Sequence, residues 1–122
     1  MLTKNLAKTA TRVRVSILNM VTSGKSSHVG TALSCADILT VLYFEIMNID
    51  PRYPEAPDRD RFILSKGHGC TAQYAVLAER GFFPKEKLET YYKKDGLIGH
   101  ATYRMVPGME ASTGSLGHGL GI

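Results

Sequence analysis

Apolar residues recur at helical spacing in the first part of the chain. In the N-terminal segment one stripe repeats every three to four residues, with lysines and arginines lying off it, and the stripe consists of Leu2, Leu6, Ala10, Val13, Ile17, Leu18 and Val21. This pattern predicts an amphipathic helix that ends near Ser23 and Gly24. The segment from Leu33 to Met47 is apolar almost all round and carries an S-x-x-D start signal at Ser34 and Asp37. It predicts a helix that begins near Ser34 and is buried on most of its faces.

The pattern changes after a proline-rich loop. The run from Arg61 to Ser65 reads as a short strand and leads directly into a turn of alternating glycines, Lys66-Gly67-His68-Gly69. A third helix is expected over Cys70 to Arg80, closed by Gly81. A strand, a glycine turn and a helix in this order place polar groups at the carboxyl end of a strand in α/β sheets.

The rest of the chain is polar, then irregular. Lys85 to Lys93 predicts a fourth, polar helix, and the stretch from Lys94 to Thr113 is expected to lack regular structure. A glycine-rich turn then enters the apolar run that stops at Ile122. Because only one strand is convincing, we expect residues 1–122 to be the helix-rich N-terminal portion of a larger α/β domain.

Composition narrows the possible partners. The chain has 122 residues, 43% of them hydrophobic and 21% charged, with a net charge of +4, which is typical of one soluble domain. The basic residues are spread along the first and fourth expected helices, and no basic run is interleaved with aromatic residues. These features favour solvated helix faces over nucleic-acid binding.

Cysteine usage and the absence of a leader bear on location. The two cysteines, Cys35 and Cys70, form no C-x-x-C pair and are expected to be buried free thiols in a reducing compartment. No apolar stretch behind the N-terminal lysines reads as a secretory signal, and no segment approaches the ~18 apolar residues that span a bilayer. We therefore expect a cytoplasmic protein with no membrane partner.

All four histidines lie next to or within two residues of a glycine, in polar turns: His28, His68, His100 and His118. Glycine lets the backbone bend sharply and lets a ligand approach closely, and histidine changes charge near neutral pH. The pattern predicts one assembled polar site. For each histidine a surface position without function is the alternative, which is most plausible for His118 and weaker for His68 in the strand-to-helix turn.

Two other kinds of site fit poorly. A zinc site is disfavoured because the separations of the histidines are long and irregular and no H-x-x-x-H spacing occurs. A P-loop at Gly24-Lys25-Ser26 is disfavoured because its partner glycine would fall at Asn19 and a helix precedes it. The interleaved leucines of Gly114 to Gly121 argue against a flexible tail, so this turn is interpreted as backbone that approaches a planar or anionic ligand.

Three stretches in order resemble the thiamine-diphosphate-binding N-terminal part of transketolases, most of all the N-terminal subunit of transketolases that are split in two. Ser27-His28-Val29-Gly30 resembles the family's S-G-H-x-G turn. Arg59 to Gly69, RDRFILSKGHG, resembles R-D-R-F-x-L-S-x-G-H, and Val106 to Gly119, VPGMEASTGSLGHG, resembles P-G-V-E-x-x-T-G-S-L-G-x-G. The resemblance implies a doubly wound parallel-sheet domain of which this chain supplies part.

The resemblance also implies roles for individual residues. His68 matches a histidine that contacts the diphosphate, and His28 and His100 match histidines that hydrogen-bond sugar hydroxyls and help to move protons. Thr31 matches a small hydroxyl position near the cofactor. The stretch that lies against the aminopyrimidine is matched by Gly114, Ser115 and Leu116. His118 stands where relatives commonly carry glutamine.

The implied activity is transfer of a two-carbon ketol unit from a ketose phosphate to an aldose, as in the pentose phosphate pathway, with thiamine diphosphate and Mg²⁺. The family's metal-binding G-D-G segment and its activating glutamate have no counterpart up to Ile122. We therefore expect the metal ligands to lie outside this chain, and expect an oligomer with a C-terminal subunit or a missing remainder, inactive without it. The alternative is a non-catalytic interaction module whose second helix is an assembly surface, or a truncated remnant of that fold.

Two departures touch the substrate side of the expected site. Ser27 replaces the glycine that usually precedes the first histidine, and Ala101 replaces the proline that usually follows the third. They leave the sugar specificity open.

Overall fold

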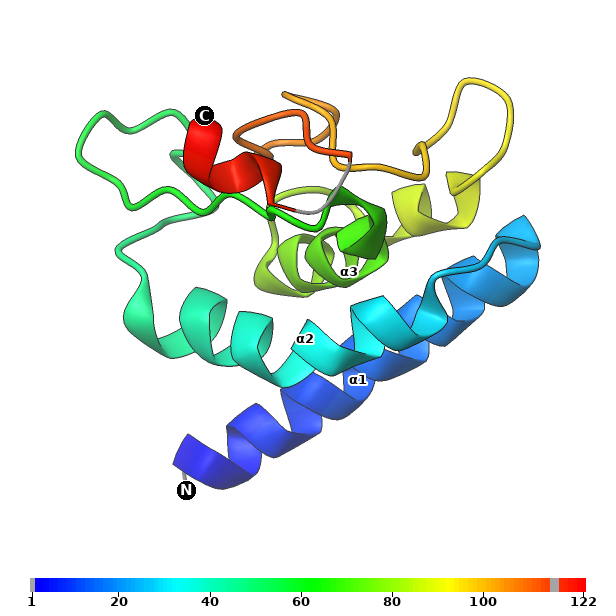
Figure 1. Ribbon diagram of the computed structural model, residues 1–122. Coiled ribbons are helices and arrows are strands. Elements are labelled where there is room, and N and C mark those ends of the chain that lie inside the picture. Colours follow the sequence, from blue (N-terminus) through cyan, green and yellow to red (C-terminus); the bar gives the residue numbers. More distant parts are fainter. Residues whose placement is uncertain (1, 115–116) are drawn as a thin grey trace.

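Among the described residues, three α-helices form a helical layer in which the third lies on the first two, and a loop layer of irregular segments and short helical turns covers the third (Figure 1). The computed structural model describes residues 2–114 and 117–122. The α-helices are α1 (Leu2–Gly24), α2 (Val29–Val41) and α3 (Cys70–Arg80). The short turns are the π-helical η1 (Leu42–Ile46) and the 3₁₀-helical η2 (Gly67–Gly69), η3 (Lys85–Thr90) and η4 (His118–Gly121).

Helix α1 has the extent that its apolar spacing predicts. Its buried stripe, which includes Val13, Ile17 and Met20, packs against both α2 and α3. Leu18, which the spacing placed on the same stripe, is 47% exposed. Successive residues of a helix differ by about 100° in direction, so the neighbour of a fully buried Ile17 lies at the edge of the packed face.

Helix α2 begins earlier than the prediction near Ser34. The helix starts at Val29, directly after His28, and Ser34 lies inside it, where its hydroxyl donates to the carbonyl of Thr31 at 2.9 Å. The S-x-x-D pattern is therefore not a cap. The expectation of burial on most faces is also wrong, because Ile38 is 62% exposed and only one face packs on α1 and α3.

The helical stretch Val29–Ile46 corrects a further expectation. It is 18 residues long with a mean hydropathy of 1.5, so by length and composition alone it could cross a membrane. One third of it is buried, through contacts with α1 and α3. Core helices of water-soluble domains have the same composition, so this stretch is weak evidence for a membrane span.

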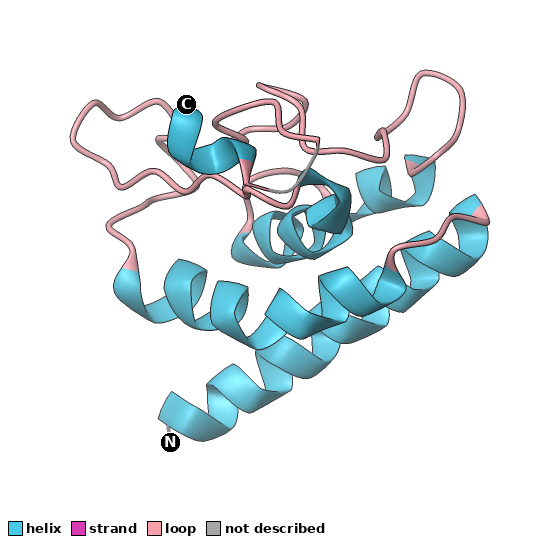
Figure 2. Ribbon diagram, viewed as in Figure 1, coloured by secondary structure: helices cyan, strands magenta, loops and turns pink. Residues whose placement is uncertain are grey.

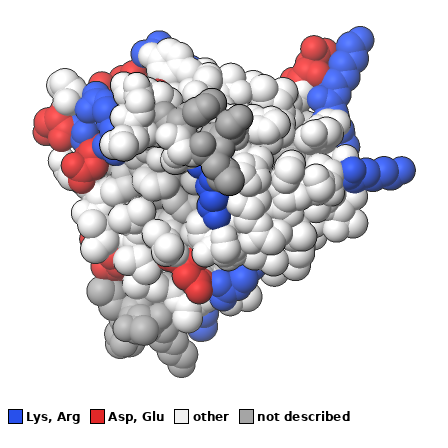
Figure 3. Space-filling view, in the orientation of Figure 1, with Lys and Arg blue, Asp and Glu red and all other residues white. Residues whose placement is uncertain are grey.

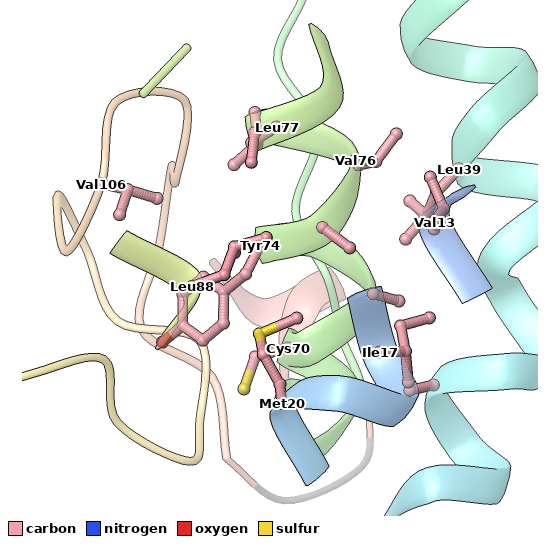
Figure 4. Packing of buried hydrophobic residues seen from close by; sticks show 14 of the residues in the cluster. Val13, Ile17, Met20, Leu39, Cys70, Tyr74, Val76, Leu77, Leu88 and Val106 are labelled. Atoms are coloured by element: carbon pink, nitrogen blue, oxygen red, sulfur yellow. The ribbon is translucent and has the colours of Figure 1, made fainter. Parts of the chain in front are cut away.

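Helix α3 lies between the other helices and the loop layer, and every residue from Cys70 to Ala78 is buried. Its side chains point both toward α1 and α2 and toward the loops (Figure 4). The predicted bounds are confirmed, with Gly81 at φ 99° ending the helix. Both cysteines are buried free thiols, as predicted, and burial raises the pKa of Cys70 to about 12.

The predicted strand is not formed. Figure 2 shows no strand in the described part of the chain, and Arg61 to Ser65 run as a loop. A strand needs a neighbour for its backbone hydrogen bonds, and here the Leu64 carbonyl accepts instead from the hydroxyl of Thr113 at 2.5 Å. The fourth helix is also shorter than predicted, since η3 ends at Thr90 and Tyr92 adopts φ 61°. The helix-rich character is confirmed for the described residues.

Candidate functional site

Three of the four histidines meet, although they lie far apart in the sequence. The rings of His28 and His68 pack edge to face with their centroids 5.1 Å apart. The ring of His100 lies 6.4 Å from that of His28. His28 and His100 are exposed and His68 is half-buried. The prediction that these histidines share one polar site is therefore consistent with the geometry, while their chemical roles stay predictions.

His28 owes its position to an unusual backbone conformation. It lies between α1 and α2 with φ 70° and ψ 25°, in the left-handed region, and its carbonyl accepts the amide of Ala32 at the start of α2. For a non-glycine residue this conformation costs roughly 1 kcal/mol. Strained residues of this kind concentrate at binding and active sites, which makes His28 a candidate functional residue.

Backbone hydrogen bonds hold three loop segments side by side next to His68. The amide of Ala101 donates to the carbonyl of Gly67, and the amide of Thr113 donates to the carbonyl of Ala101, both at 3.0 Å. A Cβ on Gly67 would lie 1.9 Å from the carbonyl oxygen of Thr113. Only glycine allows this approach, so Gly67 fixes the segments that carry His68, His100 and Gly114 relative to one another.

Two other glycines have free space where a side chain would be. A Cβ on Gly30 or on Gly114 would meet no heavy atom of the described residues within 4 Å, apart from chain neighbours and the backbone of Gly30's own helix, and neither residue has a positive φ. Packing and backbone conformation therefore do not require glycine at either position. Free space beside the histidines would let a ligand approach the backbone closely.

Lys66 is a residue of this region that the sequence interpretation missed. Its ammonium donates to the carbonyl of Thr31 at 2.6 Å and to the hydroxyl of Ser34 at 2.7 Å. These bonds connect the first turn of α2 to the loop that carries His68. Lys66 occupies the variable position of the S-x-G-H pattern, and no local spacing signals a partner 35 residues away.

The remaining predicted residues are placed as follows. Thr31 lies in the first turn of α2, and its hydroxyl would be 3.6 Å from a Cβ on Gly69. Ser115 and Leu116 lie outside the described residues, as does the side chain of His118. The segment after them returns to the site, since the amide of Gly119 donates to the Ser65 hydroxyl at 3.0 Å.

Metal binding has no donor set in the described part of the chain. There, no group of three histidine, cysteine, aspartate or glutamate side chains could hold a metal ion, the clustered histidines included.

An ion pair joins two of the stretches that carry the family resemblance. The guanidinium of Arg59 donates to both carboxylate oxygens of Glu110, the second at 3.1 Å, and the two side chains are 10% and 14% exposed. The bond to Glu110 raises the pKa of Arg59. A bidentate pair of this kind fixes orientation as well as distance. Other charges are dispersed, and Figure 3 shows acidic and basic side chains close together at the edges of one face.

Comparison with known proteins identifies the family of this chain. The family model described as "Transketolase, thiamine diphosphate binding domain" matches residues 5–122. The chain is 44% identical over 114 residues to an apulose-4-phosphate transketolase subunit of Actinobacillus succinogenes, covering 93% of this chain and 41% of that protein. It is 47% identical over 93 residues to 6-deoxy-6-sulfo-D-fructose transketolase subunit SqwG of Clostridium sp. (strain MSTE9), covering 75% of this chain and 34% of that protein.

A solved structure shows the same similarity in three dimensions. Transketolase from Leishmania mexicana superposes with a TM-score of 0.88 at 36% identity, covering 94% of this chain and 18% of that one. The chain thus spans about two fifths or less of the length of these relatives. The family match over nearly all of its residues and the identity to transketolase subunits carry one conclusion: this chain belongs to the transketolase thiamine diphosphate binding domain family.

Proposed function

We propose that this chain supplies part of the thiamine diphosphate site of a transketolase-type enzyme, which moves a two-carbon ketol unit from a ketose phosphate to an aldose. The observation that carries the proposal is the convergence of His28, His68 and His100 beside open space at Gly30 and Gly114. Imidazoles next to unfilled backbone suit an anionic, partly planar ligand with sugar hydroxyls nearby.

The chain's residues divide this work by position. His68 would donate to the diphosphate, where a hydrogen-bond donor stabilises negative charge. His28 and His100, both exposed, would hydrogen-bond the sugar hydroxyls and hold or release protons near the ketose carbonyl. The backbone at Gly114, Ser115 and Leu116 would lie against the aminopyrimidine, with Thr31 nearby. When bound, the cofactor supplies the electron sink that cleavage of the carbon–carbon bond needs.

The proposal includes groups outside this chain. The described residues provide no metal ligand set, so ligands for Mg²⁺ would come from elsewhere in the assembly. Two relatives are named as one subunit of an apulose-4-phosphate transketolase, which supports a partner subunit. We propose that residues 1–122 form part of a doubly wound α/β domain, that the enzyme is an oligomer in the cytoplasm, and that the chain alone is inactive.

Two measurements test the proposal. Titration of the 122-residue chain with thiamine diphosphate and Mg²⁺ by calorimetry should give weak binding or none, and tight binding would contradict the requirement for outside metal ligands. Joining the chain to the rest of an N-terminal transketolase subunit, which carries the family's metal-binding segment, and adding a C-terminal subunit should restore both binding and ketol transfer.

One observation favours a second candidate function. Ile38 on α2 and Ile46 on η1 are 62% and 66% exposed. Exposed apolar residues on one helical stretch are typical of an assembly surface. Stable association with the partner subunit but persistent inactivity would favour a non-catalytic interaction module.

A further inference from the structure

Lys66 lies between the two turns that carry His28 and His68. Its backbone directly precedes η2, the turn that contains His68. Its side chain runs across Gly69, where a Cβ would be 3.6 Å from the Lys66 Cε, and ends on Thr31 and Ser34. Thr31 is three residues after His28. One lysine therefore connects the backbones on which both histidines stand.

Ion pairing does not explain this position. Among the described residues no carboxylate forms a salt bridge with Lys66. The ammonium also lies at the first turn of α2, where the helix already presents positive potential and favours anions over cations. The hydrogen bonds to the Thr31 carbonyl and the Ser34 hydroxyl are short, and a hydrogen bond from a charged donor is stronger than a neutral one.

The bonds of Lys66 act on the part of α2 that determines the direction of His28. The Ser34 hydroxyl accepts from Lys66 and itself donates to the Thr31 carbonyl, so the three groups form a closed set. His28 stands at the N-terminal end of this turn in a left-handed conformation, without a side-chain cap of its own. A shift of this turn relative to η2 would move the His28 ring away from His68.

We propose that Lys66 is a positioning residue: it holds the first turn of α2 against η2 and thereby sets His28 beside His68. Its consequence for catalysis rests on the proposed function, while its effect on the two rings does not. Lys66 acts through His28 and Thr31 rather than through the reacting atoms.

The first test measures the ring geometry in the 122-residue chain. With ¹³C-labelled histidine, nuclear Overhauser contacts between the His28 and His68 rings should be visible in the wild type and lost in Lys66→Met, which keeps the length but removes the donors. Lys66→Arg should restore them, and Ser34→Ala, which removes one acceptor, should weaken them. Lys87→Met, at an exposed lysine of η3, is the matched control and should leave them unchanged.

The second test uses the complete assembly, in which the chain is combined with the groups that the proposed function places outside it. Lys66→Met should raise the KM for the ketose donor about tenfold, as loss of a charged hydrogen bond at a positioning residue implies. The Kd for thiamine diphosphate should change by less than about twofold, since the proposed diphosphate contact is His68, and Lys66→Arg should recover most of the KM.

Two outcomes would overturn the inference. One is a ring contact that persists in both Lys66→Met and Ser34→Ala. The other is a Kd for thiamine diphosphate that rises as much as the KM, which would make Lys66 a ligand of the cofactor. If the wild-type assembly shows no ketol transfer, the proposed function fails, and the ring contacts still decide the role of Lys66.

Discussion

The helical layer and the loop layer of this molecule are held together in different ways. In the helical layer, apolar side chains such as Val13, Ile17 and Leu39 are fully buried between helices. In the loop layer, the segments around Gly67, Ala101 and Thr113 are joined by backbone hydrogen bonds at a distance that admits no side chain. The candidate site lies in the turns and in this second layer, with α2 as one of its walls.

The difference is instructive about what each layer tolerates. Apolar packing is non-directional, so a helix accepts substitutions of similar volume. Backbone hydrogen bonds and glycine contacts fix direction and distance, which a site needs if three imidazoles are to reach one ligand. The helical layer provides most of the burial, and the loop layer provides the placement.

The largest loss of stability should come from a cavity in the helical layer. Ile17→Ala should lower the free energy of unfolding by about 3 kcal/mol, because Ile17 is fully buried and its loss leaves a cavity. Leu18→Ala, one residue along the same helix but 47% exposed, is the control and should cost less than about 1 kcal/mol. Urea denaturation of the two variants measures the difference, and equal costs would mean that α1 is not packed as described.

The loop layer should respond to a single added methyl group. Gly67→Ala should destabilise the chain by about 2 kcal/mol, because the new Cβ would lie 1.9 Å from the Thr113 carbonyl oxygen. Gly30→Ala meets no atom and lies in a helix, so it should be neutral or stabilise by up to about 1 kcal/mol. Thermal denaturation followed by circular dichroism gives both values.

The proposed function adds a prediction about ligand binding by the Gly30→Ala variant. Gly30→Ala fills space beside His28 and should weaken binding of thiamine diphosphate in the assembled enzyme by about tenfold or more, without loss of stability. A variant that binds normally would show that the space at Gly30 is not used by the ligand.

The smallest expected effect is the pH-dependent contribution of Glu79 to the stability of the helical layer. Burial alone would raise the pKa of Glu79, but hydrogen bonds from Lys85 and Arg12 outweigh it and lower the pKa. Because the folded-state pKa is lowered, the stability that Glu79 contributes is present above its unfolded pKa of 4.5 and is lost as pH falls through the folded value. The gap in stability between wild type and Glu79→Gln should therefore shrink from about pH 6 to about pH 3.

The size of that gap should stay below about 1 kcal/mol, since both basic partners are more than half exposed. Glu89→Gln, at an exposed glutamate of η3 that forms no salt bridge among the described residues, is the matched control. A gap that is constant with pH would contradict the lowered pKa of Glu79.

Much of the helical layer could be predicted from the sequence. The extents of α1 and α3 could be predicted. Helix α1 buries one apolar face, α3 is buried on all sides, and a glycine stands at the end of each. The start of α2 could not be found, since it depends on the left-handed conformation of His28, which no cap residue signals. The strand at Arg61 to Ser65 failed because a strand exists only with a partner, which local sequence does not specify.

Some residues of the candidate site could likewise be predicted from the sequence, and others could not. Glycine neighbours marked His28, His68 and His100, and the family resemblance gave them roles that stay predictions. Lys66 escaped notice because its hydrogen bonds connect distant residues and depend on how α2 packs on the loop. The predictions for Ser115 and Leu116 concern residues outside the described part of the chain.

The left-handed backbone of His28 has a consequence for evolution. Lys25, Tyr92 and His28 all have positive φ, so a library selected only for heat resistance should favour glycine at each. Selection for the proposed ketol transfer should instead keep the imidazole at position 28 and leave the other two positions free to change. The difference between the two sequence profiles would measure how much stability the lineage gives up at this one turn to keep a histidine there.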